Sequence, residues 1–436
     1  MIRDPTGIST RWWGPYAVAG VFILADFLWL ARGLSYPRSG YEVWALNHGV
    51  YSDIVKLSIN HYVRGAHVIH PLPYVHDKIE YPVLLGFILW LPSWLPGGPA
   101  SWFAAAGVIT VAATFGSIAL IRRHSPRSAW WLAATPALLL DAGINWDLVG
   151  ILFMVGAVVW FGEGRYSLSG MSTAIGTLFK LFPVVAAPMA VSALGSRWWR
   201  SSSAAGVVGD RATVPGAPDD DAEPSAPTAL ARWLIPFTVI CVVVLVPFLA
   251  VARSNTLYFV RFNSMRPEKD SIWGLLGRVF GTSLVSSHHI NTLSLLMVTA
   301  AVAYGAWMVW RAPVPQQARA MALATAVAII VWMAVNKVWN PQYVLWVFAA
   351  GALTAMPARF GVILGGISIF DYAFEFVLRL PDQTNPFNWV DYLTMLARTA
   401  IFAVMVAWAI GQLRALVAGA VPAPAPAGDA PAQSRA

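Results

Sequence analysis

The sequence predicts an all-α, polytopic membrane protein, and two observations carry this prediction. Hydrophobic residues make up 58% of the 436 residues, and the mean hydropathy is +0.60. Apolar windows recur along almost the whole chain, many of them close to the roughly 20 residues that a helix needs to cross the bilayer. In lipid only helices or closed barrels satisfy their own backbone groups, and these windows are too continuous for barrel strands. We therefore expect about ten to twelve helices.

The charges and the single cysteine exclude other classes of protein. The formal net charge is +8, but the basic residues lie mostly in short connections between apolar windows, as the positive-inside rule expects. We therefore expect membrane lipids as partners and no nucleic acid. Cys241 lies within an apolar window, so it permits no intrachain disulfide and argues against redox chemistry.

The first apolar run, Gly14 to Leu34, is predicted to be an uncleaved membrane anchor. It follows Arg3 and Arg11, contains Asp26, and lacks a small-residue cleavage site. Its N-terminus is then expected in the cytoplasm. That orientation places the polar loop of residues 35–81 on the outer face of the cell membrane.

This outer loop concentrates titratable groups, among them Asp53, Glu80 and four of the chain's eight histidines. A membrane chain with 11% charged residues rarely gathers so many at one place without a chemical use. We expect the loop to form the floor of an active site. Within it, Tyr41 to Tyr62 has apolar residues at helical spacing, which is typical of a helix lying along the interface. Three prolines then end any further helix: Pro71, Pro73 and Pro82.

Two topologies are open between residues 82 and 147. The basic run Arg122 to Arg127 favours the cytoplasm, which leaves Asn145-Trp146-Asp147 outside. That interpretation requires the thirteen residues from Val83 to Leu95 to be re-entrant or interfacial, because they are too few to span. Counting every window as a span gives the opposite sides. We favour the topology that follows the charges.

The apolar window from Met171 to Leu194 is interrupted by Lys180 and Pro183. One interpretation is a lysine that extends to the interface beside a proline kink. The other is a broken helix that directs a cation into a polar cavity. In the second half of the chain we expect six spans, near Trp233 to Val251, Thr292 to Trp310, Ala320 to Val335, Tyr343 to Ala355, Val362 to Leu378 and Leu393 to Leu413.

Composition divides the chain into four parts. Residues 1–195 and 231–415 are the two membrane-embedded parts. Residues 196–230 are rich in Ser, Ala, Gly and Pro, carry the acidic run Asp219 to Glu223, and lack apolar periodicity. We expect a disordered cytoplasmic linker there, and a disordered low-complexity tail over residues 416–436.

The expected outer face gathers polar groups from distant segments. Besides the first loop, these are residues 145–147, 253–290, 336–342 and 379–390. Carboxylates, cations and aromatic rings on one rim are typical of a site for a polar substrate. Four basic residues are candidates to bind phosphate, although a lipid headgroup would suit any one of them equally: Arg261, Arg266, Lys269 and Lys337.

Six short motifs resemble, in order, those of the GT-C superfamily of polyprenyl-phosphate-sugar-dependent glycosyltransferases. The likeness is greatest to the actinobacterial α-1,2-mannosyltransferase group that acts on phosphatidylinositol mannosides. The motifs are Tyr51-Ser52-Asp53, Glu80-Tyr81-Pro82, Asn145-Trp146-Asp147, the run Gly176 to Pro183, the stretch Arg266 to Trp273, and the stretch Asn336 to Tyr343. The chain departs from the family at Val83, where a second proline is common, at Asn340, where a serine often precedes the proline, and in its long linker.

The resemblance implies an inverting membrane glycosyltransferase that moves a sugar, in the first place mannose, from a polyprenyl-phosphate donor to a lipid-linked or glycan acceptor. The active site would lie on the extracytoplasmic face. Asp53 would be the general base, a role typically worth ~10²–10⁴ in rate; alternatively, Asp53 caps a helix in the loop. Twelve residues are implied in substrate binding: Glu80, Tyr81, Asp147, Lys180, Arg261, Arg266, Lys269, Lys337, Gln342, Tyr343, His288 and His289.

Three alternatives stand beside this interpretation. A polyprenyl-phosphate-arabinose arabinofuranosyltransferase fits the same residues. A lipid or solute transporter, or a flippase, would use the broken helix at Lys180 as a midplane site. A divalent metal is the third. We expect no cofactor and do not favour a metal site, because the spacings of His61, His67, His70 and His76 match no zinc signature.

Overall fold

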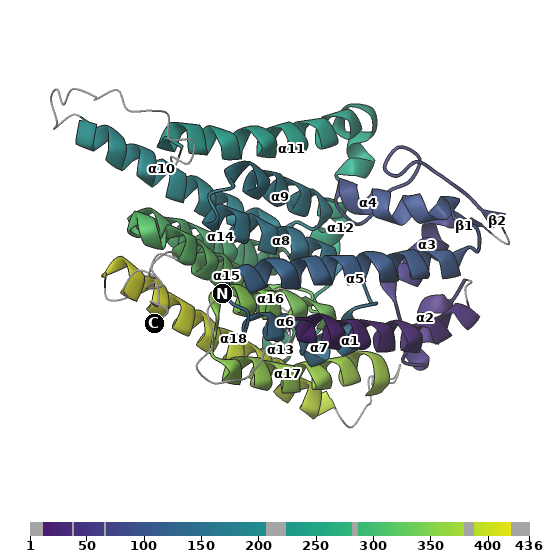
Figure 1. Ribbon diagram of the computed structural model, residues 1–436. Helices are drawn as coiled ribbons and strands as arrows, with labels where there is room; N and C mark the ends of the chain where they lie inside the picture. Colours follow the sequence, from purple (N-terminus) through teal and green to yellow (C-terminus); the bar gives the residue numbers. More distant parts are fainter. Residues whose placement is uncertain are drawn as a thin grey trace, which may run out of the picture.

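The structure is a computed structural model that describes residues 12–36, 39–64, 67–205, 224–280, 287–378 and 388–419. These residues form a bundle of helices, most of which run side by side (Figure 1). Seven of the described helices are long and apolar enough to cross a membrane: Gly14–Ser35, Pro99–His124, Ala226–Met265, His288–Arg311, Val314–Val335, Ala358–Val377 and Trp389–Val417. The protein is therefore a multi-pass membrane protein, and the expected all-α class is confirmed.

In chain order the elements are α1 (Gly14–Leu30), η1 (Ala31–Ser35), α2 (Tyr41–Asn47), α3 (Asp53–Tyr62), β1 (Val63–Arg64), β2 (His67–Val68), α4 (Val83–Trp90), η2 (Leu91–Trp94), α5 (Pro99–His124), α6 (Ala129–Ala133), α7 (Pro136–Asp141), α8 (Asp147–Gly162), α9 (Tyr166–Phe179), η3 (Phe182–Val185), α10 (Ala186–Ala205), α11 (Ala226–Thr256), α12 (Tyr258–Met265), α13 (Ile272–Phe280), α14 (Ser287–Arg311), η5 (Val314–Gln316), α15 (Gln317–Val335), η6 (Pro341–Tyr343), α16 (Val344–Thr354), α17 (Ala358–Tyr372), η7 (Ala373–Leu378) and α18 (Asn388–Val417). The two strands pair as a short antiparallel hairpin.

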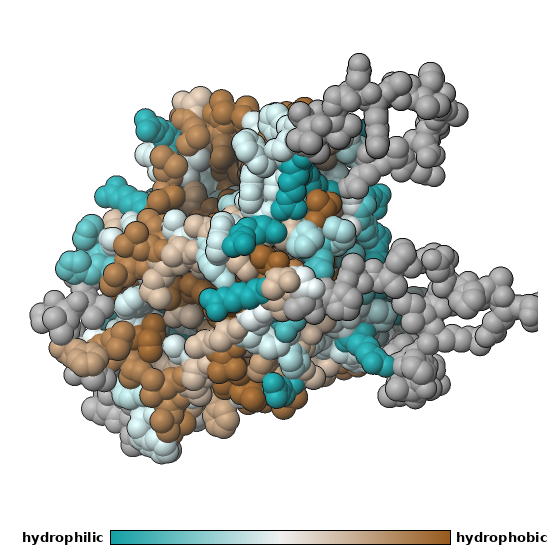
Figure 2. Space-filling model, turned by 90° about the vertical axis from the view of Figure 1, so that its left-hand side faces the viewer, coloured by the Kyte–Doolittle hydropathy of each residue, from teal (hydrophilic) through white to brown (hydrophobic). Residues whose placement is uncertain are grey.

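One end of the bundle is basic. Helices α5, α14 and α18 finish there with Arg122 and Arg123, Arg311, and Arg414 in their last turns. We call it the arginine end. Figure 2 faces this end, where hydrophilic side chains lie among apolar ones. The opposite end carries α2, α3 and the β1–β2 hairpin (Figure 1).

Helix α15 lies at the centre of the bundle and α11 at its edge. In α15, 72% of the apolar window is buried, whereas none of the corresponding window of α11 is. The buried side of α15 is rich in alanine, and the helix packs against α14, α18, α16 and α10. Hydrocarbon tails are as apolar as leucine side chains, so moving an apolar side chain from lipid into the bundle gains little free energy. Close packing of small residues contributes more to the association of membrane helices.

Among the described glycines, Gly170 permits the closest helix contact, which joins α9 and α11. A Cβ atom on Gly170 would overlap the carbonyl oxygen of Trp233. The Trp233 indole N–H also donates to Ser169 Oγ at 3.1 Å. The missing side chain at Gly170 therefore lets α11 reach its position against the rest of the bundle.

The first polar loop differs in one respect from the expectation. The single helix expected from Tyr41 to Tyr62 is two helices, α2 and α3, because Gly49 adopts φ +64° between them. The apolar side of α3 packs against α5 and α4, with residues such as Ile54 and Leu57 fully buried. It is thus covered by protein, whereas a helix lying along the interface would face lipid.

The segment that begins at Val83 forms a helix too short to span the bilayer, as the re-entrant interpretation requires. Helix α4 and turn η2 together cover Val83 to Trp94, a shorter apolar helix than the seven spans. A Cβ on Gly98, just before α5, would lie 4.0 Å from Val68 of the hairpin. The chain therefore begins α5 near the hairpin end.

The boundaries of the linker and the tail need correction. Residues 196–205, expected in the linker, continue α10, and α11 begins at Ala226. Arg197 donates to Gln317 Oε1 and to the Tyr166 hydroxyl, both at 2.7 Å, and these bonds hold this turn of helix against its neighbours. Helix α18 continues to Val417, into the expected tail. Residues 206–223, 379–387 and 420–436 lie outside the described part of the chain.

The outer segment expected from Arg253 to Ile290 contains structure of its own. Helix α11 is kinked at Ala252, whose φ of −142° and ψ of 50° are not helical. Helices α12 and α13 follow it. The charged residues of this segment therefore stand on short helices and the turn between them.

We predict that Gly170→Ala destabilises the protein, because the added methyl group forces α9 and α11 apart. Overpacking of this kind costs about 1–3 kcal/mol, measured as a lower midpoint of thermal unfolding in detergent. Gly411→Ala on α18 is the matched control, since a Cβ there meets nothing within 4 Å. Equal stability of the two variants would contradict the proposed close contact.

Candidate active site

A cavity of about 410 Å³ lies at the end of the bundle opposite the arginine end. Its walls come from distant parts of the chain: the first polar loop, the turn before α8, the break after α9, α12 with the turn that follows, the segment from the end of α15 to the start of α16, and η7. Charged residues are concentrated in its lining: Glu42, Asp53, Lys56, Glu80, Lys180, Arg266, Lys269 and Glu375. The fold thus brings together cations and carboxylates that are far apart in the sequence.

Asp53 is held by two hydrogen bonds from outside its helix. The Tyr51 hydroxyl donates to Oδ1 at 2.6 Å, and Asn145 Nδ2 donates to Oδ2 at 2.9 Å. The N-cap of α3 is Ser52, which makes no capping bond with its side chain. The alternative in which Asp53 caps a helix is therefore wrong. Burial, and then the Asp53 charge, raises the pKa of Tyr51 well above its usual value, which keeps this hydroxyl a donor.

A short turn before α8 fixes the backbone around Asp53. The Ser52 hydroxyl donates to the Gly143 carbonyl at 2.7 Å, and the Asp53 N–H donates to the Ile144 carbonyl at 2.8 Å. The Gly143 N–H in turn donates to Asp26 Oδ2 of α1 at 2.6 Å. The carboxylate in the first apolar window therefore anchors the turn that positions Asp53.

Asn145 and Tyr81 extend this arrangement across the cavity. Asn145 Nδ2 also donates to the Tyr81 hydroxyl at 2.8 Å. Lys180 Nζ lies 4.7 Å from the centre of the Tyr81 ring. Tyr81 therefore stands between the carboxylate of Asp53 and the ammonium of Lys180.

Lys180 lies where the helical run from α9 to α10 breaks. Its backbone is extended, with φ −141° and ψ 130°, and its side chain is only 8% exposed. Its Nζ is 3.1 Å from Asp147 Oδ1, which also accepts from Trp346 Nε1 at 3.0 Å. Lys180 thus does not extend to the surface, and Asp147 lies behind the cavity wall and holds the lysine.

The cations of the cavity differ in what they pair with. Among the described residues, Arg266 forms no ion pair and lies against the Phe262 ring at 5.4 Å. The other three are paired with carboxylates: Lys56 with Glu42 at 2.9 Å, Lys180 with Asp147, and Lys269 with Glu375. Arg266 is therefore the cation best placed to bind an added anion.

Three further predicted residues line the cavity: Glu80, Gln342 and Tyr343. Burial, with a smaller contribution from the Asp53 charge, raises the pKa of Glu80. Burial also raises the pKa of Tyr343 to about 12, so its hydroxyl stays protonated at neutral pH. The cavity thus offers neutral hydroxyl donors as well as charges.

The wall that carries Lys269 is pinned by its backbone. The Lys269 N–H donates to the Lys337 carbonyl at 3.0 Å, and the Trp339 N–H donates to the Lys269 carbonyl at 2.8 Å. Lys337 itself points away and donates to the Ser264 carbonyl at 2.9 Å. Burial and then the nearby Arg266 charge lower the pKa of Lys337. Lys337 therefore supports the wall from behind.

A buried arginine holds the next residue of the same wall. Asp270 adopts a left-handed φ of +49°, which is uncommon for a residue other than glycine. Its carbonyl accepts from Arg398 at 2.6 Å. Arg398 also pairs with Asp371 at 2.5 Å and lies 4.0 Å from the centre of the Trp339 ring. The α17 and α18 helices thereby fix the turn between α12 and α13.

Three predicted residues stand away from the cavity. Arg261 is exposed on α12, and His288 and His289 are exposed at the start of α14. In the first polar loop, His61 pairs with Asp77 at 2.5 Å. The described residues include no group of three His, Cys, Asp or Glu side chains that could hold a metal ion.

Several site residues escaped prediction although the sequence carried a signal for them. Glu375, Asp371 and Arg398 are ionisable residues within apolar windows, which by default mark a buried partner or a site. Asn145 belongs to one of the six motifs, but a role for its side chain became evident only from its two hydrogen bonds.

We predict that Lys180→Met destabilises the protein, because the buried carboxyl group of Asp147 then loses its cation partner. Breaking a buried pair in this way costs about 3–5 kcal/mol, measured by thermal unfolding in detergent. Combining Lys180→Met with Asp147→Asn should recover part of the loss, because no unpaired charge remains. A Lys180→Met variant as stable as the wild type would contradict the pairing.

No protein-family model matches the chain, and no curated protein matches it. One solved structure that matches is the crystal structure of ArnT from Cupriavidus metallidurans bound to undecaprenyl phosphate, at a TM-score of 0.37 and 16% sequence identity. The match covers 78% of this chain and 66% of that chain, slightly less than two thirds of the ArnT structure.

Proposed function

We propose that this protein is a membrane glycosyltransferase that moves a sugar, in the first place mannose, from a polyprenyl phosphate to a hydroxyl of a lipid or glycan acceptor. One observation supports the proposal most strongly. A carboxylate fixed by Tyr51 and Asn145, and an arginine without an ion pair among the described residues, line the same cavity. The first can accept a proton and the second can bind a phosphate.

In the proposed reaction Asp53 accepts the proton of the acceptor hydroxyl. The acceptor oxygen then bonds to the anomeric carbon, and the bond from that carbon to the phosphate oxygen breaks. The electron pair of the broken bond leaves with the polyprenyl phosphate. Attack from the face opposite the leaving group inverts the configuration. A carboxylate has about four lone-pair sites, so the two bonds to Asp53 leave room for the acceptor.

Arg266 is proposed to bind the phosphate of the donor, and its planar guanidinium can form two parallel hydrogen bonds with phosphate oxygens. Glu80, Gln342 and Tyr343 line the cavity as partners for sugar hydroxyls. Phe259, Val260 and Phe262 of α12 line it with apolar surface, which suits a prenyl chain. Because the leaving group is already charged and Arg266 is proposed to bind it, we propose that no cofactor is needed.

The reaction is proposed to take place on the outer face of the cell membrane. The positive-inside rule favours the cytoplasm for the arginine end. The cavity lies at the opposite end of the bundle.

We predict that Asp53→Asn lowers the transfer rate by about 10²–10⁴, the usual contribution of a general base. The assay measures radiolabel transferred from polyprenyl-phosphate sugar to lipid or glycan in membranes. Asp77→Asn is the matched control, since Asp77 lies in the same loop outside the cavity lining and pairs with His61. Full activity of Asp53→Asn at normal protein levels would refute the assignment.

The same assay distinguishes the alternatives. Mannose and arabinose donors are supplied in turn. If label is transferred only from the arabinose donor, the transferred sugar is arabinose and not mannose. Lipid flipping in proteoliposomes without any glycosidic product would show that the protein is a transporter and not a glycosyltransferase.

We predict that Arg266→Gln weakens use of the donor, because the phosphate loses a charge-assisted hydrogen-bond partner. Such bonds contribute about 1.5–3 kcal/mol, so kcat/KM for the donor should fall by about ten- to a hundredfold. Arg261→Gln should leave kcat/KM unchanged, because Arg261 is exposed on the same helix and does not line the cavity. Equal losses in the two variants would show that surface charge, and not the cavity, attracts the donor.

A further inference from the structure

Helix α1 carries one acidic residue, Asp26, and the proposed reaction does not use it. Its side chain is buried, with 2% of the residue exposed. No cation among the described residues pairs with its carboxyl group. An ionisable side chain within a membrane helix costs free energy, and by default it marks a functional site or a buried partner. Asp26 therefore needs an explanation of its own.

The partner of Asp26 is the turn between α7 and α8. Asp26 Oδ2 accepts a hydrogen bond from the Gly143 N–H at 2.6 Å. The turn comes this close to α1 because Gly143 has no side chain. A Cβ atom there would lie 2.9 Å from Leu30 Cδ1 and 3.2 Å from the Phe27 ring. Three residues of α1 thus pack around a single glycine of the turn.

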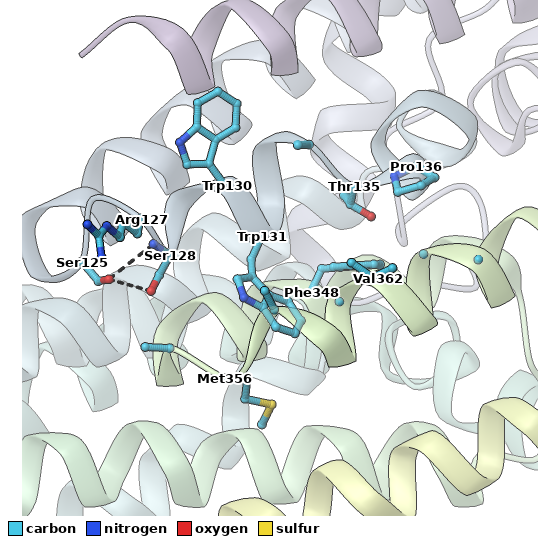
Figure 3. Close-up of a pocket in the computed structure, with 16 residues that line it drawn as sticks. Ser125, Arg127, Ser128, Trp130, Trp131, Thr135, Pro136, Phe348, Met356 and Val362 are labelled. Carbon is cyan, nitrogen blue, oxygen red and sulfur yellow. Dashed lines mark hydrogen bonds between the residues drawn. The ribbon is translucent and has the colours of Figure 1, made fainter. Parts of the chain in front are cut away.

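The segment before the turn gives it little support. Helix α7 has only six residues, Pro136–Asp141, and a helix shorter than about 12 residues has marginal stability in isolation. Beside its first residues lies a cavity of about 680 Å³, whose lining includes Thr135, Phe348 and Val362 (Figure 3). Contacts with other helices must therefore hold the turn, and the hydrogen bond to Asp26 is the contact that reaches α1.

The same turn holds the proposed base. The Asp53 N–H donates to the Ile144 carbonyl at 2.8 Å, and Asn145 Nδ2 donates to Asp53 Oδ2 at 2.9 Å. Gly143, which donates to Asp26, directly precedes Ile144. A shift of the turn therefore carries the Asp53 carboxylate with it. Misplacing a reacting group by about 1 Å lowers a rate by as much as about a hundredfold.

We propose that Asp26 is a positioning residue for the transfer reaction, because its bond to Gly143 fixes the turn that orients Asp53 towards the acceptor hydroxyl. This inference rests on the proposed function and on Asp53 as its base. Asp26 does not line the cavity, so it touches neither the donor nor the acceptor. Its removal therefore lowers kcat and leaves the KM for the donor unchanged, and it has this effect only when Asp53 is present.

The test measures kcat and the donor KM per folded molecule, with the radiolabelled polyprenyl-phosphate mannose or arabinose that the wild type uses. Asp26→Leu removes the acceptor, and we expect kcat to fall by about ten- to a hundredfold at an unchanged KM. Asp26→Asn keeps an acceptor oxygen and should restore most of kcat. Gly170→Ala is the control for lost stability, since its close contact joins α9 and α11, and it should leave kcat unchanged.

A double-mutant cycle distinguishes positioning from a general structural role. In an Asp53→Asn background, Asp26→Leu should cause no further loss of kcat, because the base that it positions is already gone. The same fold-loss in both backgrounds would overturn the proposal. So would a wild-type kcat in Asp26→Leu, or an Asp26→Asn variant as slow as Asp26→Leu.

Gly143→Ala decides the question if Asp26→Leu does not fold. Its added methyl group displaces the turn from α1 while Asp26 stays in place, so kcat should again fall, and an unchanged kcat would overturn the proposal. A wild type that transfers neither sugar would refute the proposed function and this inference together. A wild type that transfers sugar no faster than Asp26→Leu would refute the inference alone.

Discussion

The hydrogen bond from Asn145 to Asp53 is the interaction on which the geometry of the cavity depends. It joins residues 92 positions apart, one in the first polar loop and one in the turn before α8. The same amide holds the Tyr81 hydroxyl, and the turn itself is anchored to Asp26 of the first membrane helix. A carboxylate at the surface of a loop would sample several rotamers. Here Asp53 receives one orientation from a chain of contacts that ends inside the bundle.

The sequence predicted the long helices well because crossing a bilayer imposes a length and an apolar composition that can be counted. It predicted the short elements less well for the same reason. Helix α16, from Val344 to Thr354, is almost wholly buried by other helices, so no bilayer thickness fixes its length. The expected linker began too early because Arg197 and Arg200 resemble a cytoplasmic loop in composition. In the structure they donate to groups on neighbouring helices, and those bonds are tertiary.

For the site, the sequence predicted which residues line the cavity better than it predicted what each of them does there. Motifs near the ends of apolar windows brought attention to Asp53, Glu80, Lys180 and Arg266, and all four line one cavity. The sequence could not rank the cations, because ranking depends on which of them meets a carboxylate in space. Lys180 and Lys269 do, whereas Arg266 does not among the described residues. Nor could it separate residues that line the cavity from those that support its walls.

Helix α12 gives the cavity one wall unlike the others. It has no buried residue, and it follows the kink in α11 at Ala252, while the opposite wall is fixed by the hydrogen bonds around Asp53. A sideways displacement of α12 would break the hydrogen bonds from Lys337 and Asn291 to the Ser264 carbonyl, but it would break none of the hydrogen bonds around Asp53. Under the proposed function, a lipid-linked donor would enter the cavity laterally from the bilayer on the side of α12, while Asp53 keeps its hydrogen bonds to Tyr51 and Asn145. Under such an arrangement, tolerance for different lipid tails and selectivity for the sugar would be properties of separate segments, free to diverge independently.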